Sequence, residues 1–387
     1  MQHAPPPARR SAPDRVGLAV VGAILLSLTI LGGNIWLNMQ AAGVTPGYGF
    51  LSQTAGFDLS ESLIPYDAGD SYGRVILAGL LNTVFLAICG LVLATGLGVV
   101  MGLVSVTPSP AGRMIALLYV ELFRNLPKIL VLLVLYVVAV RGLPPVREAL
   151  SIGPLHLTNR SIYMPAIEAD ARQLWLLLPL AAAVAVAVLW HRHARRIKRD
   201  TGRDIVVLPV ILAAIIGLPL IFAVLADTPL VPSLPEFRRF DFDGGARLSV
   251  QFIVVLVTLG LYHGAQIAEV VRGGILSVPQ GQVEAARALG LTPRHVTRFV
   301  VLPQVLRIVI PPMINQYVNL IKNTSIAIAV GYSDLMSISG TIINQTFRPL
   351  EMMLVTMGLY LGLCLVASSL MNRLNDRLRA RGAGGAA

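Results

Sequence analysis

Long apolar runs constrain this 387-residue chain more than any other feature of its sequence. Hydrophobic residues make up 55% of it and charged residues only 13%, whereas a soluble domain carries about a quarter charged residues. About 20 apolar residues suffice to cross the hydrocarbon core of a bilayer as a helix. Eight runs approach or exceed that length: Val16–Leu37, Val75–Val106, Met114–Val140, Leu174–Trp190, Ile205–Ala226, Leu248–Val271, Pro303–Val330 and Met352–Leu370. The sequence therefore predicts an all-α, polytopic membrane protein with about eight transmembrane helices.

The segments between the runs are polar. Residues 1–15 are rich in Pro and Arg without periodicity, which predicts a disordered cytoplasmic tail. Residues 38–73, 141–172 and 227–247 are interpreted as external loops. Two runs are interrupted: Met114–Val140 by polar residues in its first half, and the seventh run by a proline pair. These residues are Glu121, Arg124, Asn125, Lys128, Pro311 and Pro312.

The net charge of +11 does not indicate a nucleic-acid partner, because the basic residues lie between apolar runs. If the N-terminus is inside, the internal segments contain about twice as many Lys and Arg residues as the external loops. This bias predicts that both termini are cytoplasmic. The basic cluster 191–199 is interpreted as a stop-transfer and headgroup anchor. His191 and His193 have no carboxylate or cysteine nearby, and the two cysteines lie apart in apolar runs. No metal site or disulfide is predicted.

One organised polar stretch, residues 277–303, stands out. Pro279 suits the first turn of a helix, and Gly290 suits the left-handed position just past a helix end. Thr292 followed by Pro293 then reads as an N-cap and first helical residue. The stretch predicts a short helix, a sharp turn and a second helix, with Pro303 introducing the next span.

The spacing of residues within this stretch resembles the EAA loop of ABC importer permeases. In that pattern Glu-Ala-Ala is followed after three residues by Gly and, nine residues later, by an aliphatic, any residue and Leu-Pro. The matching residues are Glu284, Ala285, Ala286, Gly290, Val300, Leu302 and Pro303. The resemblance implies a coupling helix that docks on a cytoplasmic ATPase, with small residues allowing close approach. The alternative is an amphipathic helix at the membrane interface.

Three further segments resemble the polar amino-acid permeases of this class. They are Leu80–Val84, Tyr119–Pro127 and Pro311–Ser325, although Asn125 stands where the family usually has Gly. The resemblance implies the type I ABC importer permease fold. Its core would occupy residues 74–140 and 248–375, with an extra helix and loop at 16–73, an insertion with two helices at 141–247 and a tail at 376–387. This long form looks closest to the Q-type subunit of general L-amino-acid importers and to glutamate/glutamine/aspartate/asparagine importers.

The family resemblance implies a permease subunit that carries polar L-amino acids across the bacterial inner membrane. No Gly-Lys-Ser/Thr occurs, since the lysines are Lys128, Lys198 and Lys322, so ATP must be hydrolysed elsewhere. The implied partners are an ATPase homodimer, a second permease in a heterodimer and a periplasmic binding protein. The chain itself is expected to bind no cofactor and to catalyse no bond cleavage.

Polar groups within spans are candidates for a substrate pathway or gate, because charges in the bilayer are costly. They are Asn82, Thr83, Glu121, Arg124, Asn315, Asn319, Lys322 and Thr324. A zwitterionic substrate needs a cation and an acceptor, which Lys322 or Arg124 with Glu121 would supply. The alternative is that Glu121 and Arg124, one turn apart, form a structural pair and that Lys322 snorkels or pairs with the second permease.

Rival functions stay open from the sequence. An ion-driven secondary transporter would usually show inverted repeats, and none is evident. A scaffold subunit, or an importer of opines, cystine or another polar solute, is a further alternative. The segment Gly331–Asp334 loosely resembles an intramembrane serine hydrolase but lacks a convincing histidine partner.

Overall fold

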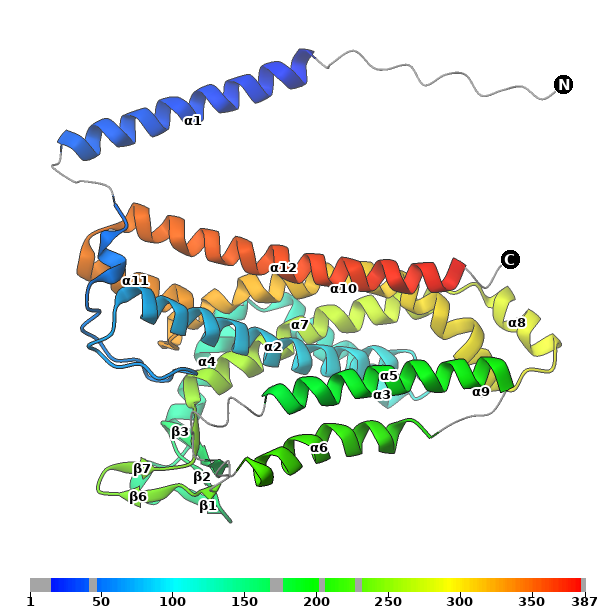
Figure 1. Cartoon of the computed structure of the whole chain (residues 1–387). Helices are drawn as coiled ribbons and strands as arrows, with labels where there is room; N and C mark the ends of the chain where they lie inside the picture. Colours follow the sequence, from blue (N-terminus) through cyan, green and yellow to red (C-terminus); the bar gives the residue numbers. More distant parts are fainter. Residues whose placement is uncertain (1–14, 42–46, 168–176, 202–205, 227–231, 384–387) are drawn as a thin grey trace.

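The computed structural model describes residues 15–41, 47–167, 177–201, 206–226 and 232–383. Nearly all of the predicted disordered tail 1–15 lies outside these residues. The described chain is mostly helical, with short strands at one end (Figure 1). Its helices are α1 (Arg15–Ala41), α2 (Tyr72–Ser105), α3 (Pro110–Asn125), α4 (Lys128–Gly142), α5 (Leu177–Thr201), α6 (Leu208–Leu225), α7 (Val250–Leu276), α8 (Gln280–Ala288), α9 (Pro293–His295), α10 (Leu302–Asn323), α11 (Leu335–Thr346) and α12 (Pro349–Ala383).

Among the described residues, fewer helices than the predicted eight are by themselves long and apolar enough to cross a membrane. Of the described helices, five are long and apolar enough to cross a bilayer, or six if α3 and α4 form one broken span. The described parts of predicted spans four and five form α5 and α6, with apolar stretches Leu178–Ala194 and Leu208–Phe222. The first residues of both predicted spans, 174–176 and 205, lie outside the described residues. The basic cluster 191–199 is helical and forms the last part of α5, so the helix extends beyond the apolar run. Similarly, α12 runs to Ala383, well into the predicted tail 376–387.

The predicted third span is broken into α3 and α4, which meet at an angle of 104°. Leu126 has extended backbone dihedrals (φ −83°, ψ 137°) and precedes Pro127, whose ring disfavours a helical conformation in the residue before it. Pro127 then caps the start of α4. The predicted third span therefore consists of two helices rather than one continuous helix, and its polar interruption lies at the bend.

The predicted break at Pro311 and Pro312 is wrong, because both prolines lie inside α10. The helix packs against α7 and α12, and this packing compensates for the backbone hydrogen bonds that the prolines lack. Pro303 lies in the first turn of α10, as predicted. No break precedes it, because α9, a π-helical segment at Val296–Val301 and α10 follow one another directly.

The centre of the bundle is the pair α2 and α7, which approach closely through glycines of α2. A Cβ atom added at Gly98 would lie 2.5 Å from the Ile267 side chain, and one added at Gly102 would lie 2.7 Å from Val271. Small residues four apart allow two helix backbones to pack at short range in a membrane. This pair fixes the frame on which both ends of the molecule are built.

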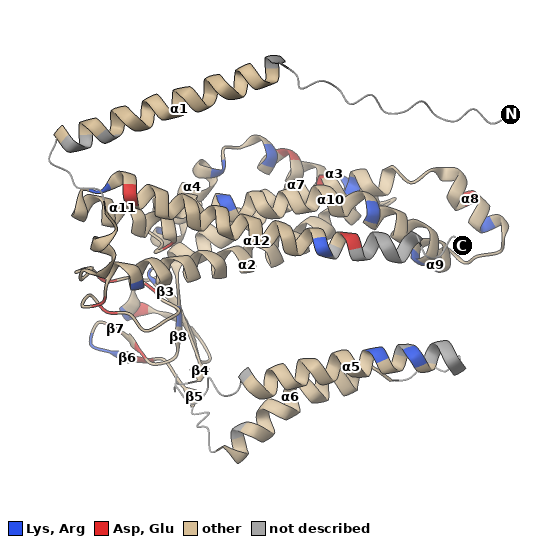
Figure 2. Cartoon of the chain, turned by 45° about the horizontal axis from the view of Figure 1, so that its top comes forward, with Lys and Arg blue, Asp and Glu red and all other residues tan. Residues whose placement is uncertain are grey.

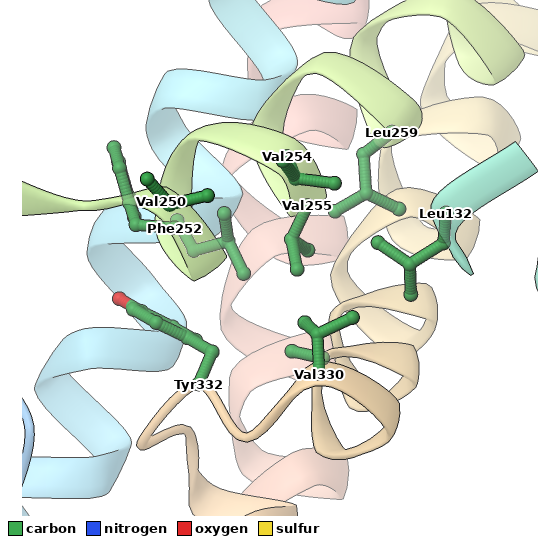
Figure 3. Close-up of a cluster of buried hydrophobic side chains, with 10 residues drawn as sticks. Leu132, Val250, Phe252, Val254, Val255, Leu259, Val330 and Tyr332 are labelled. Atoms are coloured by element: carbon green, nitrogen blue, oxygen red, sulfur yellow. The ribbon is translucent and has the colours of Figure 1, made fainter. Parts of the chain in front are cut away.

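One end of α7 is held by a buried apolar cluster (Figure 3). Leu259 of α7 and Leu132 of α4 are fully buried there, and Tyr332 approaches from the segment after α10. Phe252 stacks on Phe85 of α2 with ring centroids 5.3 Å apart. The cluster joins α2, α4 and α7 at the end where the strands lie.

The segments predicted as polar loops at 141–172 and 227–247 contain short strands within their described parts. These are β1 (Leu150–Ile152), β2 (Leu155–Leu157), β3 (Ser161–Met164), β4 (Ala166–Ile167), β5 (Pro232–Ser233), β6 (Glu236–Arg238), β7 (Asp241–Asp243) and β8 (Ala246–Ser249). An antiparallel sheet has the order β1-β2-β3-β8, with Ile162 opposite Leu248. Ser249 ends β8 and caps α7 by accepting a hydrogen bond from the Phe252 amide.

The bundle has two distinct ends (Figure 1). We call the end that carries α8 the loop end, and the end that carries the sheet and α11 the strand end. The end of α12 lies at the loop end. α5 and α6 pack against each other beside the bundle, and the apolar window of α1 is wholly exposed.

Candidate functional site

The polar stretch at the loop end has the predicted helix–turn–helix conformation. Pro279 is the N-cap of α8, one position before the first turn. Gly290 has φ +79°. The Gly290 amide donates to the Arg287 carbonyl at 2.9 Å and the Leu291 amide to the Ala286 carbonyl at 3.3 Å. These two bonds form a Schellman motif, which needs a left-handed residue at the glycine position.

The second helix of the stretch starts as predicted and then changes from α-helical to π-helical geometry. The Thr292 side chain caps α9, and Pro293 is its first residue. Pro303 has no amide hydrogen to donate to the turn before it, and that turn is the π-helical segment Val296–Val301. The Leu302 amide bonds to Thr297, five residues back, and the Gln304 side chain donates to the Val300 carbonyl. The Leu-Pro pair therefore sets the geometry between the loop and α10.

Most of the surface of α8 is exposed and does not pack against the rest of the described chain. Ala286 is buried against the helical segment that follows, whereas Glu284 and Ala285 are exposed. Leu289 is 83% exposed and Phe299 62% exposed. A carboxylate, a small residue and bare apolar side chains thus share one rigid loop, a combination typical of a protein–protein docking surface.

Asn82 and Thr83, predicted as pathway residues, lie buried at the strand end. The Asn82 amide nitrogen donates to the carbonyls of Ser333 at 2.8 Å and Glu61 at 3.0 Å. Thr83 accepts a hydrogen bond from the Leu335 amide at 3.0 Å. Both residues tie α2 to the segment that leads into α11, so their visible role is structural.

Glu121 and Arg124 are exposed near the α3–α4 bend, and no ion pair joins them in the described chain. Glu121 instead accepts a hydrogen bond from the side chain of Asn125 at 2.9 Å. The predicted structural pair is therefore wrong. Asn125, the residue that departs from the family pattern, takes the place of the expected arginine.

Asn315, Asn319 and Lys322 are exposed on α10. Their spacing of four and three residues places them on one face of the helix. Thr324, by contrast, is fully buried and donates to the Ile321 carbonyl at 2.8 Å. The structure thus separates an exposed polar stripe on α10 from a buried threonine at its end.

A polar cluster inside the bundle was not predicted as such. Lys128 donates to the Asn323 side chain, whose amide nitrogen lies 3.1 Å from Nε2 of His263. His263 is 1% exposed, and within the described chain its Nδ1 and the Oε1 of Gln316 have no hydrogen-bond partner. A histidine within an apolar span was the signal available in the sequence. The cluster joins α4, α7 and α10.

Comparisons with known proteins find relatives that match most of the chain. The family model described as binding-protein-dependent transport system inner membrane component matches residues 94–380. The chain is 36% identical to the general L-amino acid transport system permease protein AapQ of Rhizobium johnstonii, over 92% of this chain and 90% of AapQ. It is 37% identical to the putative amino-acid ABC transporter permease protein YhdX of Escherichia coli K12, over 92% of each chain.

A solved amino acid ABC transporter with histidines is 18% identical to the chain. It covers 79% of this chain and 95% of its own, with a TM-score of 0.47.

Proposed function

The chain belongs to the binding-protein-dependent transport system inner membrane components, and from this membership we propose that it imports polar L-amino acids as the permease subunit of an ATP-driven complex. AapQ and YhdX are named for amino-acid transport, which supports the substrate class. The same membership is at odds with an ion-driven secondary transporter. In this role the chain cleaves no bond and binds no cofactor of its own.

The observation that carries the proposal is the exposed, rigid surface of α8. Glu284, Ala285 and Leu289 point away from the bundle, and the Schellman motif at Gly290 fixes the end of the helix. A preorganised loop loses little conformational entropy when it docks. The partner proposed for it is the ATPase dimer, whose closure on ATP would move α8 and, through Leu302 and Pro303, α10.

The exposed stripe on α10 supports a second partner. Polar groups in a span usually face a bundle interior or a water-filled path, yet Asn315, Asn319 and Lys322 are uncovered by this chain. A second permease, in a heterodimer, would cover this face and enclose the pathway. Glu121 and Arg124 stay candidates for the gate, whereas the buried positions of Asn82, Thr83 and Thr324 favour a structural role.

Charge supports an orientation with the loop end in the cytoplasm of a bacterial cell and the strand end facing the binding protein. Figure 2 shows Lys and Arg residues, in blue, on α8, near α9 and on the polar half of α5. Residues of this kind are retained on the cytoplasmic side of bacterial inner membranes. Both termini would then be cytoplasmic.

A pull-down in mild detergent tests the proposal. The tagged wild-type chain is compared with Gly290→Arg, and Gly331→Arg is the matched control because Gly331 also has a positive φ (+76°) and open space around it. We expect an ATPase to co-purify with wild type and with the control, and to be lost from Gly290→Arg. If no ATPase co-purifies with a wild-type chain that still drives amino-acid uptake, the proposal is wrong.

A further inference from the structure

A polar cavity of about 500 Å³ opens at the strand end. Its walls come from the last turns of α4, from strands β3, β7 and β8, and from the first turn of α7. Pockets for small ligands have volumes of about 300–1,000 Å³. The cavity is therefore large enough for one amino acid and a few waters.

Two arginines supply positive charge to this cavity. Arg247 on β8 is held in place by donating to the Ser60 carbonyl. Arg160, just before β3, makes no side-chain hydrogen bond or ion pair within the described chain. Arginine's planar guanidinium suits carboxylate recognition through paired hydrogen bonds. One fixed and one free guanidinium thus face the same space.

Asp241 supplies the opposite charge. Its Oδ1 accepts hydrogen bonds from the Tyr163 hydroxyl and from the Phe242 amide, the latter at 2.9 Å. Burial raises the pKa of Tyr163 to about 12, so the phenol stays protonated and keeps donating. Oδ2 of Asp241 has no partner among the described residues. The hydrogen bonds to Oδ1 fix the orientation of the Asp241 carboxylate, and Oδ2 is available to accept from a bound cation.

The start of α7 forms a further wall of the cavity. Ser249 and Gln251 line it, and α7 is 27 residues long. The amino-terminal end of a long helix carries partial positive charge and favours bound anions. Here the carboxylate of Glu61 already occupies that end, because it accepts hydrogen bonds from the Ser249 hydroxyl and, at 3.5 Å, from the Ser249 amide. The positive charge of the cavity therefore comes from the two arginines.

From this arrangement we propose that the cavity binds a free acidic amino acid, such as glutamate or aspartate. Two guanidinium groups match its two carboxylates, and Asp241 matches its ammonium group. The lining supplies two positive side chains and one negative side chain, as a ligand with two carboxylates and one ammonium group requires. The proposal rests on the proposed function, and it names a substrate class and a first binding step at the outer face.

The cavity depends on the predicted insertion at 141–247. Arg160, Tyr163, Asp241 and Arg247 all lie within that segment, whereas Ser249 and Gln251 belong to the predicted core. A permease with only the core would keep the walls from α4 and α7 but would lack both arginines and Asp241. The binding step is therefore specific to long forms of the permease.

Equilibrium binding tests the site directly. The complex of this chain with its permease and ATPase partners is placed in nanodiscs without the binding protein, and binding of radiolabelled L-glutamate is measured. We expect saturable binding that L-aspartate displaces and L-lysine does not. Arg160→Gln and Asp241→Asn should each weaken it about 10- to 100-fold, since each removes a charge-assisted contact. Arg238→Gln is the matched control, because Arg238 lies on β6 and pairs with Asp243 outside the cavity.

A second measurement separates lost contacts from misfolding. Glutarate has both carboxylates but no ammonium group, so wild type should prefer glutamate to glutarate by about 10-fold or more. In Asp241→Asn this preference should fall towards one. Wild-type complex that binds no glutamate, or variants that bind it unchanged, would overturn the site. The proposed function would still stand if that complex, given its binding protein, showed ATP-dependent uptake of polar amino acids. Absence of any such uptake by active complex would overturn both.

Discussion

The loop end and the strand end use polar residues in opposite ways. At the loop end, Glu284 and the apolar Leu289 are exposed, and the fold there depends on hydrogen bonds within a few residues. At the strand end, Asn82 and Asp334 are buried and bond to groups up to 251 residues away. Buried polar groups need hydrogen-bond partners within the chain, and at the strand end these bonds stabilise the fold. Exposed polar groups are hydrated, and at the loop end they are accessible to a second protein.

Asp334 gives the largest expected effect on stability. It caps α11 by accepting from the Ser337 amide at 2.9 Å and receives the Tyr360 hydroxyl at 3.3 Å. Burial raises the pKa of its carboxyl from 3.8 to about 6. The folded state thus holds the proton more tightly than the unfolded state. The contribution of Asp334 to the free energy of unfolding is therefore greatest below about pH 4. It falls by about 3 kcal/mol in all as the pH rises through about 6.

Asp334→Asn should remove this pH dependence, since asparagine keeps the cap but does not ionise. Thermal unfolding in detergent between pH 4.5 and 8 would measure it. The variant should gain stability relative to wild type as pH rises, and the difference should level off above pH 6 to 7. A difference that does not change with pH would show that Asp334 is charged at no cost in the fold.

Asn82→Ala should cost about 2 kcal/mol, because it leaves the carbonyls of Ser333 and Glu61 without their donor. The matched change at the loop end is Gln282→Ala, where the side chain is exposed; its effect should stay within about 0.5 kcal/mol. Membrane abundance and melting temperature of the two variants measure the contrast. Equal losses would remove the distinction between the two ends.

The loop end could be predicted from sequence because its signals are local. Pro279, Gly290 and the pair Thr292–Pro293 each specify backbone conformation within a few residues, and all fall where the sequence placed them to within one position. The spacing of the motif also identified the family. The contacts of that region with the rest of the bundle are few: Ala286 and Val296 are buried, and Val278 and Val301 pack against the apolar cluster around Ile267.

The strand end could not be predicted in the same way. β3 and β8 are four residues long and pair across more than 80 residues that include α5 and α6. Strands this short give no clear alternation of apolar and polar residues. The burial of Asn82 likewise depends on residues 331–335. The α3–α4 bend differs, because Leu126–Pro127 was a usable signal that the long apolar run obscured.

Gly290→Ala and Gly331→Ala test whether the two ends differ in backbone strain or only in whether they bind the ATPase. Both glycines have φ near +78° with open space around them, so a Cβ should cost about 1 kcal/mol at each. Melting temperatures should fall alike. Only Gly290→Ala should weaken co-purification of the ATPase, because the other turn lies at the strand end. Loss of the ATPase from both variants would point to general destabilisation.

Glu284→Arg should have the smallest effect on stability and a large effect on transport. The side chain is exposed and makes no ion pair among the described residues, so the free energy of unfolding should change by less than about 0.5 kcal/mol. Reversing a charge at a docking surface typically weakens association about 10-fold or more. Uptake per molecule of folded permease should fall accordingly. Glu236→Arg on β6, also exposed, is the control and should leave co-purification of the ATPase unchanged, because it lies at the strand end. If Glu284→Arg transports normally at normal abundance, α8 does not contact the ATPase through this charge, and the exposed polar groups of the loop end need another explanation.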